Sequence, residues 1–159
     1  MSTVSIEIGS YGIKGCVKTS GKPVLLELGS SASPYFMSSV AIIDKQGEII
    51  LGAPSFLDEC TSNKVVYLSE YDIEDPNFID VFSTLFKYVQ NRAELQVGEK
   101  VSKLLLVVPP QFVNHDPRKA KLKYACEKSG ISDIDFVSSD IAICYQMAKL
   151  ASGDSVLLC

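Results

Sequence analysis

The feature that most constrains this chain is an uninterrupted apolar run near its middle. Residues 104–108 read Leu-Leu-Leu-Val-Val, with no polar residue alternating between them. Such a run is typical of a central strand that is covered on both faces, as in a parallel sheet. Pro109 and Pro110 end it, because proline cannot donate a hydrogen bond to a strand ladder. We therefore expect a sheet built around a strand over residues 103–108.

Helices and strands alternate after this run. Asp116 at the N-cap and Pro117 at the first helical position predict a helix that ends at Gly130 in a left-handed conformation. The elements expected next are a strand over 133–137, a helix over 139–151 and a strand over 155–159. This alternation implies parallel neighbouring strands joined by right-handed crossovers.

The N-terminal half favours antiparallel structure instead. Short β-rich runs separated by turn residues predict strands over 4–8, 12–18 and 23–28. A hairpin is expected within an inserted segment at about 34–75, with strands over 39–43 and 48–52, and a short helix and a strand over 64–68 follow it.

A regular helical pattern begins after Asn77, which can cap it. Apolar residues recur at helical spacing up to a stop near Gly98, at Val81, Phe82, Leu85, Phe86, Val89 and Ala93. The predicted architecture is an α/β fold in which an antiparallel hairpin sheet continues into parallel strands and is flanked by helices.

The composition limits the classes of partner. The chain has 159 residues, of which 47% are hydrophobic, and this is enough for one domain with a proper core. Its net charge of -4 argues against a nucleic-acid partner, which requires a basic surface. No apolar run approaches the ~20 residues that span a bilayer, and no signal-peptide pattern opens the chain. We expect no nucleic acid, no membrane and a cytoplasmic location.

The five cysteines are scattered and form no C-x-x-C pair. They are best interpreted as reduced, small apolar residues of a cytosolic protein. With His115 as the single histidine, a zinc site is not expected.

The N-terminal hairpin carries the candidate binding chemistry. Residues 6–17 read Ile-Glu-Ile-Gly-Ser-Tyr-Gly-Ile-Lys-Gly-Cys-Val. A Gly-Ser turn between two strands exposes backbone N–H groups that can cradle an anion. Ser10 and Tyr11 can add hydroxyl donors, and Lys14 can add a positive charge. Taken alone, the same residues also fit a plain β-hairpin with a glycine turn.

Three blocks in order, within residues 6–14, 33–53 and 107–130, carry a resemblance to a known family. The first has an acidic residue, then Gly and Ser, in a hairpin turn. The second is similar to a Thr-Pro-Ser-Tyr-Val segment and a later Ile-Gly-x-x-Ala. The third has Val108-Pro109 with Phe112, Arg118-x-Ala on the next helix and a closing Gly130. Together they resemble the N-terminal lobe of the actin-like ATPase superfamily, and most of all the seventy-kilodalton heat-shock chaperones.

The resemblance implies a ribonuclease-H-like fold that binds ATP or ADP with Mg²⁺. The phosphates would contact Gly9, Ser10, Tyr11 and Lys14, and Glu7 would act on the metal through water. Protein clients or co-chaperones would be further partners. In the family a second phosphate-binding hairpin follows a strand like 155–159. Residues 1–159 would therefore be one lobe, inactive without the other.

The chain also departs from the family pattern. Glu7 stands where the family usually has Asp. Asp140 falls near the family's water-positioning glutamate, although it equally fits the first turn of a helix. Lys64 is the nearest match to the catalytic lysine, and the stretch between Gly52 and Asn77 is shorter than in the chaperones.

These departures leave a second function open, a degenerate, non-catalytic module for protein interaction or assembly. Residues 35–37, Tyr-Phe-Met, fit either an exposed contact patch or core. A strand over 155–159 could self-associate through an open edge. A sugar or acetate kinase of the same superfamily is less favoured, because its extra Gly or Thr residues in the phosphate loop are absent here.

Overall fold

The structure is a computed structural model, and it describes residues 2–19, 22–52 and 63–142. Three predictions lie outside these residues: the short helix after Pro54, the last part of the helix over 139–151, and the strand over 155–159. In the described part of the chain, no helix is both long and apolar enough to cross a membrane.

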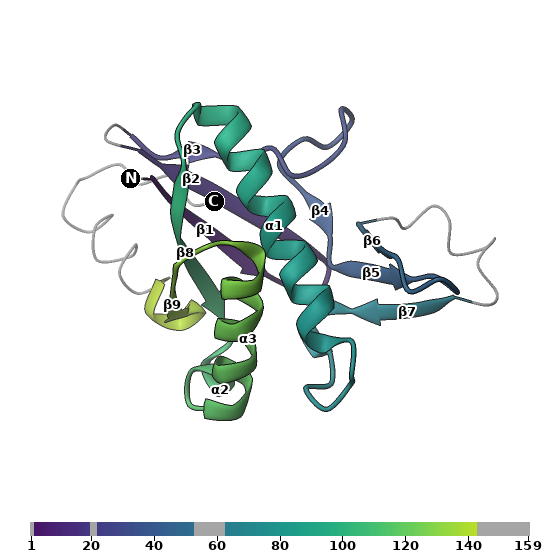
Figure 1. Ribbon diagram of the computed structural model, residues 1–159. Coiled ribbons are helices and arrows are strands. Elements are labelled where there is room, and N and C mark those ends of the chain that lie inside the picture. Colours follow the sequence, from purple (N-terminus) through teal and green to yellow (C-terminus); the bar gives the residue numbers. More distant parts are fainter. Residues whose placement is uncertain (1, 20–21, 53–62, 143–159) are drawn as a thin grey trace.

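The main sheet joins an antiparallel half to a parallel half, as predicted (Figure 1). Its strand order is β3-β2-β1-β8-β9, and β4 also pairs with β2. β1 is antiparallel to β2 but parallel to β8, which is in turn parallel to β9. The strands are β1 (Ser2–Ile8), β2 (Gly12–Lys18), β3 (Val24–Leu25), β4 (Met37–Ser38), β8 (Val101–Val108) and β9 (Asp133–Ser138).

The strand predicted over 23–28 is wrong in its length. Only Val24–Leu25 pair with β2 as a ladder. Leu26 still donates its N–H to the carbonyl of Gly15 at 2.9 Å, and the chain then leaves the ladder. Leu26 and Leu28 are buried in the core, so the apolar pattern there reflects burial and not strand pairing.

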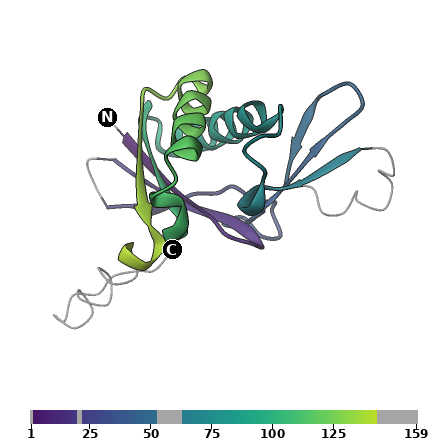
Figure 2. The same cartoon turned by 90° about the horizontal axis from the view of Figure 1, so that it is seen from below.

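A second, three-stranded antiparallel sheet lies beside the main one (Figures 1 and 2). Its order is β6 (Ile49–Leu51), β5 (Val40–Ile43), β7 (Lys64–Tyr67), and the short helical turn η2 (Leu68–Glu70) follows β7. The predicted hairpin is confirmed, with Asp44 Oδ1 accepting from the N–H groups of Gln46 and Glu48 at 2.9 and 2.8 Å. The predicted strand over 64–68 joins the same sheet.

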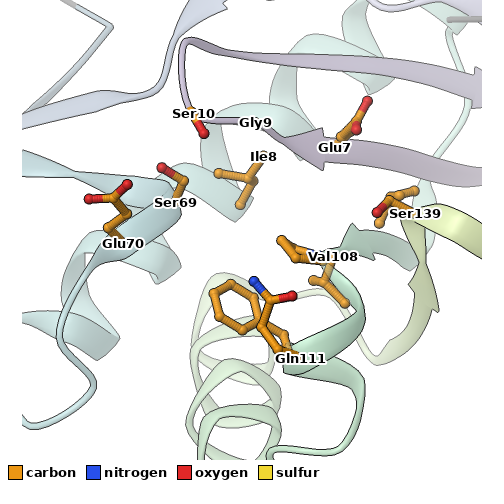
Figure 3. Close-up of a pocket in the computed structure, with 12 residues that line it drawn as sticks. Glu7, Ile8, Gly9, Ser10, Ser69, Glu70, Val108, Gln111 and Ser139 are labelled. Atoms are coloured by element: carbon orange, nitrogen blue, oxygen red, sulfur yellow. The ribbon is translucent and has the colours of Figure 1, made fainter.

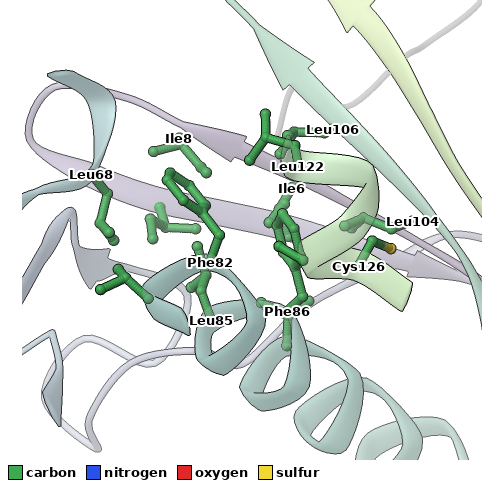
Figure 4. Packing of buried hydrophobic residues seen from close by; sticks show 14 of the residues in the cluster. Ile6, Ile8, Leu68, Phe82, Leu85, Phe86, Leu104, Leu106, Leu122 and Cys126 are labelled. Atoms are coloured by element: carbon green, nitrogen blue, oxygen red, sulfur yellow. The ribbon is translucent and has the colours of Figure 1, made fainter. Parts of the chain in front are cut away.

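Two helices, α1 (Phe78–Val97) and α3 (Asp116–Ser129), pack against each other on one face of the main sheet (Figures 1 and 2). A shorter helix, α2 (Pro110–Val113), follows β8. The whole predicted apolar stripe of α1 is buried. Figure 4 shows how Phe82 and Phe86 of this helix meet Ile6 of β1 and Leu106 of β8 in the core.

β8 is the central strand that the apolar run predicts, but in the described part of the chain only one of its two faces is fully buried. Leu104, Leu106 and Val108 are buried beneath the helices. Lys103, Leu105 and Val107 point to the other face and are half-buried. The apolar run therefore predicted correctly that this strand is central in the sheet. It did not predict correctly that both faces of the strand are buried.

The helix starts differ from the predicted caps. Asn77 has helical backbone angles, φ −88° and ψ −2°, and its side chain caps nothing, because an N-cap side chain needs an extended backbone to reach the first turn. The second cap is His115, not Asp116: its Nδ1 accepts from Arg118 N–H at 3.2 Å. Both predicted stops are confirmed, since Gly98 and Gly130 are left-handed.

Cys126 bears out the interpretation of a cysteine as a small core residue. Its side chain is 1% exposed, and burial raises the pKa of the thiol to about 12. Cys16 is half-buried. The other three cysteines lie outside the described residues.

Asp75 holds the loop that enters α1. Its carboxylate is ion-paired with Lys64, and its Oδ1 accepts from the Tyr71 hydroxyl and from Asn77 N–H, both at 2.9 Å. The hydrogen bond from Lys64 is the largest of the causes that lower the pKa of Asp75 to about 2. Tyr71 in turn stacks on Phe78, with ring centroids 5.6 Å apart, so the polar cluster is fixed to the core.

Replacing Asp75 tests this arrangement. We expect Asp75→Asn to lower the free energy of unfolding by about 1–2 kcal/mol at pH 7, because a charge-assisted network is lost. A folded-state pKa below the unfolded value of about 3.9 stabilises the fold above pH 4, and this contribution is lost as the pH falls towards 2. Urea unfolding at pH 7, 4 and 2 measures both effects.

The control is Asp133→Asn, which removes an exposed carboxylate that pairs with Lys103 on the sheet surface. We expect little change from it at any pH. Equal stability of Asp75→Asn and the unmodified chain at pH 7 would contradict the role given to Asp75.

Candidate functional site

The turn between β1 and β2 is built by two glycines. Gly9 N–H donates to the carbonyl of Gly12 at 3.0 Å, which closes the turn around Ser10 and Tyr11. Gly12 has no room for a side chain, because the ring of Phe36 lies where its Cβ would be. Phe36 is thus half-buried on the turn and Met37 is buried, while Tyr35 is 48% exposed. Of the 35–37 cluster, only Met37 is therefore core.

The turn lies at the edge of the sheet where the parallel strands end. Because β1, β8 and β9 run in the same direction, Gly9, Pro109 and Ser139, the residues that follow them, lie at one edge. In open α/β sheets, ligands bind in the crevice outside the carboxyl ends of the strands. β1 is also the strand at which the sheet changes from antiparallel to parallel pairing, since β2 lies on one side of it and β8 on the other.

A cleft of about 350 Å³ opens at this edge (Figure 3). The turn forms one wall, η2 and α2 form others, and the ends of β8 and β9 complete it. Its lining residues are Glu7, Ile8, Gly9, Ser10, Ser69, Glu70, Val107, Val108, Pro109, Gln111, Phe112 and Ser139. The volume lies within the range of small-molecule sites.

Phe112 also lines a small apolar cavity of about 20 Å³ next to the cleft, which has room for about one water. The guanidinium of Arg118 lies 4.2 Å from the centroid of the Phe112 ring, and Arg118 lines the small cavity but not the cleft. Burial lowers the pKa of Arg118. This cation therefore supports the wall of the cleft and does not line it.

The structure brings three of the predicted site residues together. Glu7, Gly9 and Ser10 all line the cleft. Tyr11, at the tip of the turn, is 89% exposed and does not line it. Lys14 is exposed on β2, directly across the ladder from Glu7, and also stays outside the lining. The roles predicted for these two side chains remain predictions.

Asp140 also lies outside the lining, in a helical segment that begins at residue 139. Its Oδ1 accepts from the hydroxyl of Ser138 and from Ile141 N–H, at 2.9 Å for the latter. These hydrogen bonds lower the pKa of Asp140. Such contacts are those of a residue that organises the start of a helix, while a catalytic role for it stays a prediction.

Sequence reasoning named only three of the twelve lining residues as site residues. Gln111 and Phe112 follow the Pro109-Pro110 stop, so the rule that ligands bind beyond strand ends could have found them. Ser69 and Glu70 carry no such signal, because their place depends on how the second sheet packs beside the first. Lys64, the nearest match to a catalytic lysine, is held by Asp75 and does not line the cleft.

The chemistry of the lining is acidic and neutral-polar. Glu7 and Glu70 are its ionisable residues, and among the described residues no lysine or arginine lines it. The described part also holds no group of three His, Cys, Asp or Glu side chains that could bind a metal by themselves. Mg²⁺ typically takes one or two carboxylates together with substrate phosphates and waters. This donor set therefore fits a metal that arrives with a polyphosphate.

Comparison with known proteins gives one informative likeness. No family model matches the chain. The chain is 24% identical, over 163 aligned residues, to a protein named chaperone protein DnaK from Nitrosopumilus maritimus (strain SCM1). The match covers 94% of this chain and 24% of that protein, so the chain spans about a quarter of the length of this relative. The likeness agrees loosely with an origin related to the seventy-kilodalton heat-shock chaperones.

The contact between Gly12 and Phe36 gives a test of how the turn is built. We expect Gly12→Ala to lower the free energy of unfolding by about 1–3 kcal/mol, because the new methyl group overlaps the ring. In a Phe36→Ala background the same change should cost clearly less, since the ring is gone. Urea unfolding of the four proteins measures the coupling, and additive costs would contradict the proposed packing.

Proposed function

We propose that this chain is the nucleotide-binding lobe of a chaperone-like ATPase, with a ribonuclease-H-like sheet and a site for ATP or ADP with Mg²⁺. The observation that carries the proposal is the cleft at the carboxyl ends of β1, β8 and β9, with the Gly9–Ser10 turn in its wall. The 24% identity to a chaperone supports it over nearly the whole chain.

In this proposal the turn contacts the phosphates. The backbone N–H groups beyond Gly9 and the hydroxyl of Ser10 donate to phosphate oxygens. Glu7 holds the metal through water, and bound Mg²⁺ would neutralise phosphate charge. Ser69, Ser139 and Gln111 add neutral donors around the same space. Tyr11 and Lys14, on the outer side of the same hairpin, are further proposed donors.

The same cleft is poorly equipped for hydrolysis. Phosphoryl transfer depends on positioning and on cations that stabilise the charge of the transition state. The described lining offers no such side chain, and Asp140 is engaged with Ser138. We propose that turnover requires a second lobe, and that protein clients or co-chaperones act on the complete, cytoplasmic protein.

The acidic lining also favours a second candidate, a non-catalytic module for protein interaction or assembly on the same fold. Nucleotide binding distinguishes the two. If the chain is an ATPase lobe, it binds ADP with Mg²⁺. If it is an interaction module, it does not bind nucleotide.

Binding measurements on variants of the turn test the proposal. We expect Gly9→Val to weaken binding of ADP with Mg²⁺ at least tenfold, because its Cβ would lie 3.2 Å from the Gly12 carbonyl oxygen and would crowd the phosphates. Ser10→Ala should cost roughly threefold to tenfold, the value of one hydrogen bond. Isothermal titration calorimetry provides the dissociation constants.

Ser31→Ala is the matched control, because Ser31 is exposed in a loop away from the cleft lining. It should bind nucleotide as the unmodified chain does. Unchanged binding by Gly9→Val, with its fold verified by circular dichroism, would contradict the proposed site.

Turnover gives a separate prediction. We expect no measurable phosphate release when the purified 159-residue chain is incubated with ATP and Mg²⁺. A phosphate-release assay with a no-protein blank measures it. Release above the blank that Gly9→Val abolishes would show that the lobe is catalytic by itself.

A further inference from the structure

Glu70 places a negative charge on the side of the cleft opposite Glu7. Glu70 is the last residue of η2, and Glu7 lies near the end of β1. Figure 3 shows the two side chains on opposite sides of the Gly9–Ser10 turn. Both side chains are exposed. A phosphate group at the turn would therefore have an acidic side chain on each side.

Three cations lie near the cleft without lining it, and the first, Lys14, stands directly across the β1–β2 ladder from Glu7 and not from Glu70. Lys64 is paired with Asp75, and Arg118 is held beneath Phe112. Among the ion pairs of the described residues, none involves Glu70. The charge of Glu70 is consequently free to act on whatever occupies the cleft.

We infer that Glu70 is a specificity-determining residue, which makes the cleft reject a metal-free polyphosphate and accept its complex with a divalent cation. This inference rests on the proposed nucleotide site and extends it. It concerns the form in which a nucleoside di- or triphosphate is recognised, and it assigns that selection to a residue outside the phosphate-binding hairpin.

The physical reason is the sign of the charges. Two unit charges a few ångströms apart near a protein surface repel strongly enough to change an affinity by a factor of ten or more. A free polyphosphate meets this repulsion from Glu70, whereas the charge of Glu7 is offset in part by Lys14 across the ladder. A divalent cation reduces the charge of the ligand and is itself attracted to carboxylate oxygens, which are the ligands that Mg²⁺ prefers. A site with a lysine in place of Glu70 would lack this discrimination.

The experiment compares ADP binding in Mg²⁺ and in excess EDTA, by calorimetry on the full chain. The measured quantity is the ratio of the dissociation constant in EDTA to that in Mg²⁺. We expect a ratio of at least ten for the unmodified chain. Glu70→Gln should lower the ratio at least threefold, mainly because metal-free ADP binds more tightly, and Glu70→Lys should lower it further.

Glu48→Gln is the matched control, because it removes one exposed glutamate from the β5–β6 hairpin, outside the cleft lining. We expect Glu48→Gln to leave the ratio unchanged, because the effect of Glu70 is local. If Glu48→Gln lowered the ratio as much as Glu70→Gln, the effect would come from the net charge of the protein, and the inference would be overturned. The inference is also overturned if the unmodified chain gives a ratio near 1, or if Glu70→Gln leaves the ratio unchanged. In both cases the proposed nucleotide site itself is not contradicted. Absence of any binding in Mg²⁺ overturns the proposed function and this inference with it.

Discussion

The parallel pairing of β1 with β8 is the contact on which the rest of the structure depends. It joins segments about 100 residues apart and sets Ile6 beside Leu106, which are 0% and 1% exposed. The two strands end at the same edge of the sheet because they are parallel. That edge becomes a cleft when the β1–β2 turn, η2 and α2 enclose it. In the described part of the chain, α1 and α3 stabilise the pairing from one side of the sheet through their apolar faces.

Much of this fold could be predicted from the sequence, because its signals are local. Apolar spacing defined α1, glycines marked the ends of both long helices, and the run over 104–108 identified the central strand. The caps failed because they depend on backbone angles and on distant partners. Asn77 looks like a cap, but the loop-holding hydrogen bonds belong to Asp75, whose other partners include Lys64 and Tyr71.

The candidate site likewise has a part that could be predicted from the sequence and a part that could not. Glu7, Gly9 and Ser10 form a local motif, and the structure sets all three in the cleft wall. Glu70 could not be found from the sequence, because it reaches the cleft only through the packing of the second sheet beside the first. The consequence is chemical: the wall opposite the β1–β2 turn contributes a carboxylate and, among the described residues, no cation. Under the proposed function, a site of this kind would favour binding of a metal–nucleotide complex over its hydrolysis.

Hydrogen–deuterium exchange of the full chain, with and without ADP and Mg²⁺, tests the central claim most directly, because it locates a ligand without any substitution. The account predicts slower exchange in three segments that are distant in sequence and adjacent in the fold: the turn at 9–12, the η2 segment at 68–70 and residues 111–113 of α2. Slower exchange confined to other parts of the chain, or no change at saturating nucleotide, would contradict it.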